Sequence, residues 1–75
     1  MERYRNFGGD SGVYAFEIGA DSIKVQFSDG AIYLYNYASA GSYNIEQMKN
    51  LARRGDGLNS FINTTVRKGY AAKIR

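Results

Sequence analysis

The sequence predicts an α+β domain: a three-stranded antiparallel β-meander with two short α-helices packed on one face. Two observations predict this fold class. Between residues 13 and 37, apolar and polar side chains alternate around two turns, as in half-buried strands. Between residues 42 and 66, apolar side chains recur instead at the three- and four-residue spacing of amphipathic helices. Three strands with one covered face suffice for independent stability, so the 75 residues are expected to form one domain.

The first strand is expected at residues 13–18, where Tyr14, Phe16 and Ile18 point to one side. A turn of small and polar residues follows, and the second strand covers residues 23–27 with the same alternation.

The second hairpin has two possible registers, which decide where the tyrosines of the third strand point. A two-residue turn would place Ile32 and Leu34 on the core face. A three-residue loop closed by Gly30 in the left-handed conformation pairs Val25 with Tyr33 instead. A slip of one residue exchanges the two faces of the strand. We favour the longer loop because it gathers on one face Tyr14, Phe16, Ile18, Ile23, Val25, Phe27, Tyr33 and Tyr35.

Two helices are expected after a connector of small residues at 38–41. The first begins at Ser42 or at Asn44, which has a glutamine three residues later as in a capping box. Two arginines and Gly55 end it, because cations and glycine both suit a helix C-terminus. Asp56 can cap the second helix. The apolar face of that helix is Leu58, Phe61, Ile62 and Val66.

The domain is expected to span residues 12–72. Residues 1–11 contain little periodic pattern and are assigned to a flexible lead-in. Residues 73–75 form a basic C-terminal end, and Tyr70 is a candidate anchor for the less regular segment after the second helix.

Composition argues against catalysis. The chain has no histidine and no cysteine, so it lacks the usual base near neutral pH and the commonest metal ligands. Its carboxylates are scattered, and no glycine-rich loop ends in Gly-Lys-Ser/Thr. We therefore expect no enzyme, no metal site and no cofactor.

The lack of cysteines, of a signal peptide and of an apolar run of roughly 20 residues predicts a cytoplasmic protein without membrane contact.

Charge is distributed unevenly along the chain. Residues 1–40 carry three basic and five acidic side chains, whereas residues 41–75 carry seven basic and two acidic ones. A basic half of a small domain attracts nucleic acid or an acidic protein. The candidate nucleic-acid-binding residues are Arg53, Arg54, Arg67, Lys68, Tyr70 and Lys73.

Two segments carry a family resemblance. Tyr33-Leu34-Tyr35 follows a strand and a glycine turn, and residues 61–67 read aromatic-x-Asn-x-x-aliphatic-Arg, with Tyr70 as a further aromatic. Together they resemble the KTSC domain, a module at the C-terminus of some lysyl-tRNA synthetases that also occurs alone in bacteria. The resemblance covers roughly residues 12–72, although the chain has no proline where relatives carry two. It implies that Tyr33, Tyr35, Phe61 and Asn63 are motif residues with structural roles.

The resemblance also implies an RNA-binding role, which has been suggested for the family from its synthetase context, while the family's function is itself unsettled. Tyr33 and Tyr35 could stack on bases, but the favoured register makes them core residues. Tyr37, Tyr43 and Tyr70 are better candidates for exposure. We therefore expect a small binding module for RNA or another nucleic acid. The alternative is a protein-interaction module that uses the outer sheet face or the basic tail against an acidic partner. A monomer is favoured, with a dimer through the sheet face as the alternative.

Overall fold

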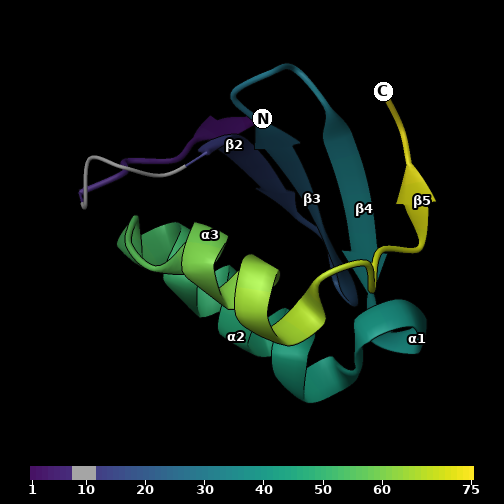
Figure 1. The fold of residues 1–75 in the computed structure, drawn as a ribbon. Coiled ribbons are helices and arrows are strands. Elements are labelled where there is room, and N and C mark those ends of the chain that lie inside the picture. Colours follow the sequence, from purple (N-terminus) through teal and green to yellow (C-terminus); the bar gives the residue numbers. More distant parts are fainter. Residues whose placement is uncertain (8–11) are drawn as a thin grey trace.

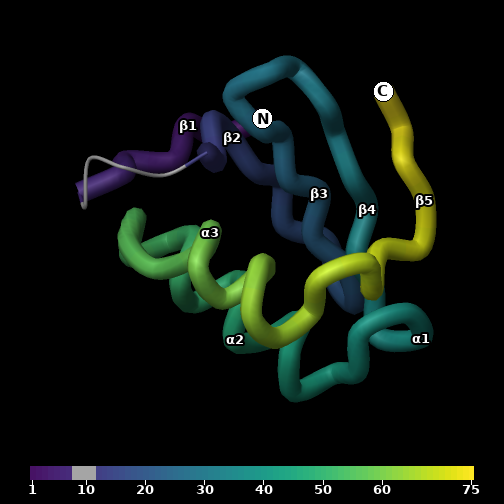
Figure 2. The backbone as a smooth tube through the Cα atoms, in the orientation of Figure 1, coloured from purple at the N-terminus to yellow at the C-terminus, as the bar shows by residue number. Residues whose placement is uncertain are grey.

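The computed structural model describes residues 1–7 and 12–75 and shows an antiparallel sheet with helices against one face (Figure 1). Within these residues the sheet has five strands in the order β1-β2-β3-β4-β5. Figure 2 follows the backbone from the N-terminal strand at one edge to the C-terminal strand at the other. The strands are β1 Glu2–Arg3, β2 Val13–Ile18, β3 Ser22–Phe27, β4 Ile32–Asn36 and β5 Ala72–Lys73.

The helical layer follows the fourth strand. It consists of α1 Tyr37–Ala40, α2 Ser42–Arg54, α3 Leu58–Phe61 and the π-helical turn η1 Ile62–Val66. Helix α2 packs on β3 and β4, while α3 and η1 pack beside α2. The α+β class predicted from the sequence is thus the observed one.

The predicted three-stranded meander was incomplete, because a two-residue strand is added at each edge. Glu2 pairs with Phe16 in β2, and Lys73 pairs with Tyr33 in β4. The boundaries predicted at residues 11 and 73 therefore do not separate the terminal segments from the sheet. Tyr4 is also buried, and its hydroxyl accepts a hydrogen bond of 3.2 Å from the Leu58 backbone N–H. The part of the predicted lead-in at residues 8–11 lies outside the described residues.

The longer loop of the second hairpin is confirmed. Val25 pairs with Tyr33 and Ile23 pairs with Tyr35. Gly30 has a φ of +93°, and its N–H donates to the Phe27 carbonyl at 2.9 Å. A positive φ of this kind is costly for residues with a side chain. The glycine thus fixes the register that turns Tyr33 and Tyr35 toward the helices.

Tyr14 was predicted on the core face, and this was wrong. The register between β2 and β3 shifts between Val13 and Ala15, which indicates a β-bulge. A bulge inserts one residue and reverses the alternation beyond it. Val13 therefore enters the core at 4% exposure, while Tyr14 is 44% exposed and packs under the Arg3 guanidinium, 4.3 Å from its ring centroid.

The helix starts also differ from those predicted. The connector at 38–41 largely belongs to the short helix α1, which Asn36 caps. The Asn36 side chain accepts a hydrogen bond of 2.8 Å from the Ser39 N–H, and the Ser39 hydroxyl accepts one of 3.1 Å from the Asn36 N–H. The capping box is therefore here and not at Asn44, and α2 begins at Ser42. Gly57, not Asp56, precedes α3. The predicted end of α2 at Gly55 is confirmed, with a φ of +77°.

The core lies between the sheet and the helices. It contains the inward side chains of β2, β3 and β4 and the apolar stripes of α2, α3 and η1, namely Tyr4, Val13, Phe16, Ile23, Val25, Tyr35, Ile45, Met48, Ala52, Leu58, Ile62 and Val66. The predicted apolar face of the second helical segment is confirmed, with Phe61 half-buried beside the fully buried residues.

Replacing Gly55 with alanine is expected to destabilise the domain more than replacing Gly30 with alanine. Both glycines have a positive φ, but a Cβ at Gly55 would lie 2.7 Å from the Cβ of Arg5, whereas nothing lies within 4 Å of one at Gly30. We expect a loss of about 1–2 kcal/mol in the free energy of unfolding for G30A, from backbone strain alone. We expect about 2–4 kcal/mol for G55A, because overpacking adds to the strain. Urea unfolding of the two variants measures the difference, and equal losses would contradict the packing of the N-terminal segment against α2.

Candidate nucleic-acid interface

The predicted basic residues fall into two groups in space. Arg53 and Arg54 are exposed in the last turn of α2, beside Gly55, whose carbonyl accepts a hydrogen bond of 2.8 Å from the Phe7 N–H. Arg67 and Lys68 follow η1 at the opposite end of the helical layer (Figure 1). The structure therefore brings only part of the predicted set together.

The second group gains members from the C-terminal strand. Lys73 in β5 lies with its Nζ atom 5.9 Å from the ring centroid of Tyr33. Pairing of β5 with β4 continues to Ile74, whose N–H donates to the Ile32 carbonyl at 2.7 Å. We call the surface formed by Arg67, Lys68, Tyr70 and Lys73 the basic–aromatic surface, and all four side chains are exposed.

The backbone after η1 is held in an unusual conformation. Arg67 has a φ of +46° although it is not glycine. Its N–H donates to the Ile62 carbonyl at 2.6 Å, and the Gly69 N–H donates to the Val66 carbonyl at 2.7 Å. Strain of this kind costs of order 1–3 kcal/mol and persists only where neighbouring contacts enforce it. The turn therefore fixes the backbone of the segment that leads from η1 to Tyr70.

Tyr70 belongs to a cluster of aromatic rings on the same side of the sheet. Its ring centroid lies 4.7 Å from that of Tyr33 and 6.3 Å from that of Tyr35, and Tyr33 packs edge-on against Phe27 at 5.7 Å. Tyr35 is 2% exposed and Tyr33 is half-buried, whereas Tyr70 is 37% exposed. Tyr35 is therefore a core residue, and Tyr70 is the tyrosine of this cluster that presents its ring to solvent.

Burial has a chemical consequence for Tyr35. Burial, together with the neighbouring Tyr33 and Tyr70 hydroxyls, raises the pKa of Tyr35 from 10.0 to about 12, and burial is the largest of these causes. The neutral phenol is thus the form that the fold accommodates.

Two further motif residues have different positions. Phe61 packs against the core from the end of α3, as its predicted structural role requires. Asn63 is exposed and lines, together with Arg67 and Lys68, an open hollow of about 510 Å³. Asn63 therefore lies at the border of the basic–aromatic surface and not in the core, where a purely structural role would place it.

Tyr37 and Tyr43 are exposed, as predicted, but they lie outside this surface. The Tyr37 hydroxyl donates a hydrogen bond of 2.7 Å to Glu46 Oε2. The buried Lys49 Nζ lies 2.8 Å from the same oxygen and donates a hydrogen bond of 2.9 Å to the Ala20 carbonyl. Hydrogen bonds from Lys49 and Tyr37 lower the pKa of Glu46, and the bond to Glu46 raises the pKa of Tyr37. This network ties α2 to the turn between β2 and β3.

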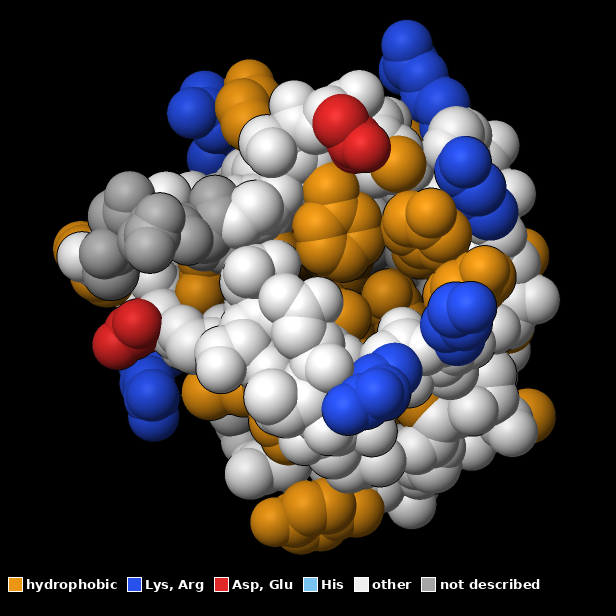
Figure 3. Space-filling view, in the orientation of Figure 1, with side chains coloured by type: hydrophobic (Ala, Val, Ile, Leu, Met, Phe, Trp, Pro, Cys, Tyr) orange, Lys and Arg blue, Asp and Glu red, His pale blue; other side chains and the backbone are white. Residues whose placement is uncertain are grey.

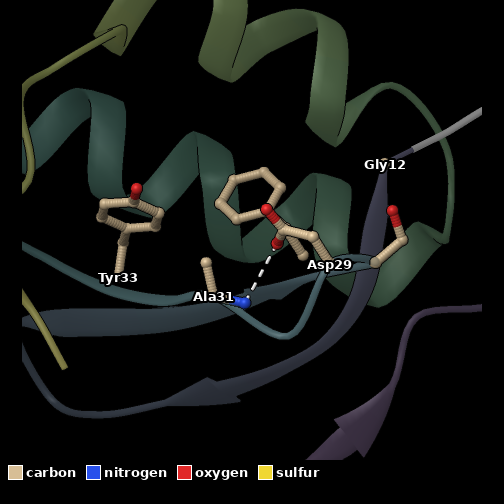
Figure 4. Close-up of a pocket in the computed structure, with 6 residues that line it drawn as sticks. Gly12, Asp29, Ala31 and Tyr33 are labelled. Atoms are coloured by element: carbon tan, nitrogen blue, oxygen red, sulfur yellow. Dashed lines mark hydrogen bonds between the residues drawn. The ribbon is translucent and has the colours of Figure 1, made fainter. Parts of the chain in front are cut away.

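A second hollow of about 360 Å³ lies beside the β3–β4 loop, and no sequence motif predicted it. Gly12, Phe27, Ser28, Asp29, Ala31 and Tyr33 line it. Figure 4 shows the Tyr33 ring rising from its strand toward the helices. In Figure 3, apolar side chains gather on part of the face shown, with Lys and Arg side chains along one border.

Comparisons with known protein families, with curated proteins and with solved structures found no match to the chain. The resemblance to the KTSC domain therefore stays a prediction. Among residues 1–7 and 12–75, no helix is both long and apolar enough to cross a membrane. The same residues contain no cluster of three or more acidic side chains arranged to hold a metal ion.

The raised pKa of Tyr35 predicts a loss of stability in alkali. In the unfolded chain the phenol ionises near pH 10, whereas the folded chain holds the proton until about pH 12. The stabilisation is therefore fully present below pH 10 and is lost as the pH rises toward 12. Between pH 9 and 11.5 the wild type should lose about 2 kcal/mol more in the free energy of unfolding than Tyr35→Phe.

Urea unfolding of both proteins at the two pH values measures this difference, because the two proteins differ only in the Tyr35 hydroxyl. Parallel losses would show that Tyr35 ionises as freely in the folded chain as in the unfolded one.

Proposed function

We propose that this chain is a small non-catalytic module that binds single-stranded RNA through the basic–aromatic surface. The observation that supports this most is the partly exposed Tyr70 ring, which packs on Tyr33 4.7 Å away between ring centroids. The Lys73 ammonium lies 5.9 Å from that same Tyr33 ring, and the exposed Arg67 and Lys68 precede Tyr70 in the chain. Proteins that bind single strands combine this pair of features: bases stack on aromatic rings, and cations follow the phosphates.

Single strands fit this surface better than duplexes. A ring that is 37% exposed offers part of one face to an unpaired base. Arg67, Lys68 and Lys73 supply few phosphate contacts, so the affinity is expected to be micromolar or weaker and to fall with salt. The KTSC resemblance, with its suggested RNA-binding role, agrees with this proposal but does not test it.

A cytoplasmic and non-catalytic role is part of the proposal. The chain contains no histidine and no cysteine, so the most common acid–base and thiolate chemistries are not available to it. A chain of 75 residues without disulfides is also more typical of a reducing compartment.

The second candidate function is binding of an acidic protein, which the same cations would attract. The outer face of the sheet, which the helices leave uncovered in Figure 1, offers a further surface with the half-buried Ile32 and Leu34. Salt dependence alone does not separate this candidate from RNA binding, since both involve charge. Stacking on Tyr70 does separate them.

Removing two cations from the basic–aromatic surface should weaken RNA binding more than removing two cations elsewhere. The double variant Lys68→Gln/Lys73→Gln and its control Arg53→Gln/Arg54→Gln have the same net charge. For single strands, each phosphate contact contributes about −0.7 to the slope of log K against log salt. The first variant should therefore reduce the slope by about 1.4, and the control should leave it unchanged. Fluorescence anisotropy with a labelled uridine-rich oligonucleotide over a salt series measures both slopes, and equal changes would mean nonspecific attraction.

Loss of the Tyr70 ring should weaken binding independently of charge. Tyr70→Leu keeps an apolar side chain against Tyr33 but removes the stacking surface, and base–aromatic stacking is worth about 1–3 kcal/mol. We expect roughly tenfold weaker binding or more, with little effect of Tyr43→Leu, whose ring is 74% exposed but lies outside the surface.

The same anisotropy titration at fixed salt measures the effect of Tyr70, and thermal unfolding confirms that both variants fold. If Tyr70→Leu binds as tightly as the wild type, bases do not stack here and the acidic-protein candidate becomes the better one.

A further inference from the structure

The hollow beside the β3–β4 loop combines an aromatic lining with one acidic side chain. Tyr33 and Phe27 are half-buried and meet edge-on at 5.7 Å, so that ring surface forms part of its wall. Asp29 lies at its border and is exposed. An aromatic wall of this kind suits a planar ring, because offset and edge contacts between aromatic rings are favourable.

The carboxylate of Asp29 is held in place by the hairpin loop. Its Oδ1 atom accepts a hydrogen bond of 3.0 Å from the Ala31 N–H. In Figure 4, the Asp29 carboxylate and the Tyr33 ring lie on either side of Ala31 and rise toward the same side of the strand. A carboxylate in this position accepts hydrogen bonds and donates none.

The charges around the hollow determine the orientation of a bound nucleotide. On the Tyr33 side, Lys73 Nζ lies 5.9 Å from the ring centroid, and Tyr70 connects the hollow to the rest of the basic–aromatic surface. On the opposite side, Asp29 would repel a phosphate. A nucleotide therefore fits with its phosphate near Lys73 and the hydrogen-bonding edge of its base near Asp29.

These features select among the bases. Guanine presents two adjacent donors on its Watson–Crick edge, N1–H and the N2 amino group, whereas adenine, cytosine and uracil each present a single donor group there. A carboxylate can accept both guanine donors at once. We propose that this hollow is a guanine-selective base site, in which Asp29 recognises the Watson–Crick edge of one unpaired guanine of a bound RNA strand. This inference rests on the proposed function, because the basic–aromatic surface must hold the strand.

Four single-stranded RNA hexamers that differ only at one central base, in an otherwise uridine sequence, test the site. A bidentate contact of a side chain with a base discriminates by about tenfold or more. We expect the guanine hexamer to bind about tenfold more tightly than the other three. In Asp29→Asn this preference should disappear, while the affinity for the all-uridine hexamer stays within about twofold.

The substitution keeps the loop, because an asparagine side chain can accept the same hydrogen bond from the Ala31 N–H. Asp56→Asn is the matched control, since it makes the same charge change at an exposed residue that does not line the hollow. It should retain the guanine preference. Amide NMR spectra of both variants confirm that they fold.

The outcomes separate the two proposals. Equal binding of all four hexamers, unchanged by Asp29→Asn, would overturn the guanine site and leave RNA binding intact. A guanine preference that persists in Asp29→Asn would overturn the role of the carboxylate. If no hexamer binds the wild type, the proposed function itself fails. If a trimethyllysine peptide binds instead and loses affinity in Asp29→Asn, the hollow is a site for cations and not for bases.

Discussion

The register of the β3–β4 hairpin determines which tyrosines of this domain enter the core. Gly30 closes a three-residue loop with a φ of +93°, and this loop pairs Val25 with Tyr33. A register shifted by one residue would turn Tyr33 and Tyr35 to the outer face and bring two aliphatic side chains inward. The aromatic cluster, the burial of Tyr35 at 2% exposure and the wall of the second hollow all follow from this one loop.

The candidate interface depends in addition on how the C-terminal segment returns to the sheet. Tyr70 packs on Tyr33 with 4.7 Å between ring centroids, and the two-residue strand β5 then pairs with the edge of β4. The strained turn at Arg67 directs the chain from η1 to this edge. The exposed Arg67 and Lys68 after η1, the Tyr70 ring and Lys73 in β5 thereby belong to one segment that connects the helical layer to the sheet.

Much of the fold could be predicted from the sequence, because the central strands and the helices are long enough to show periodicity. The hairpin register and the end of α2 at Gly55 were predicted correctly. The strands β1 and β5 have two residues each, too few for any alternation to be recognised. The bulge that exposes Tyr14 has no local signature, since it depends on pairing with another strand. The short helix α1 depends on reciprocal hydrogen bonds between Asn36 and Ser39, which the apolar pattern does not reveal.

The candidate site could be predicted only in part for a related reason. A count of charges along the chain treats Arg53 and Lys68 alike, whereas the fold places them at opposite ends of the helical layer (Figure 1). The hollow beside Asp29 is lined by the β3–β4 loop, by one residue from each of these two strands and by Gly12 just before β2, so no motif marks it. The sequence does contain the excess of basic residues in its second half, and Tyr70 lies in that half.

A titration of the isotope-labelled protein with single-stranded RNA, followed by two-dimensional amide NMR at low and physiological salt, tests the central claim most directly. The account predicts saturable shifts at residues 67–73 that persist at physiological salt, with little change at Arg53 and Arg54. Shifts that are spread evenly over both basic groups and vanish with salt would contradict it.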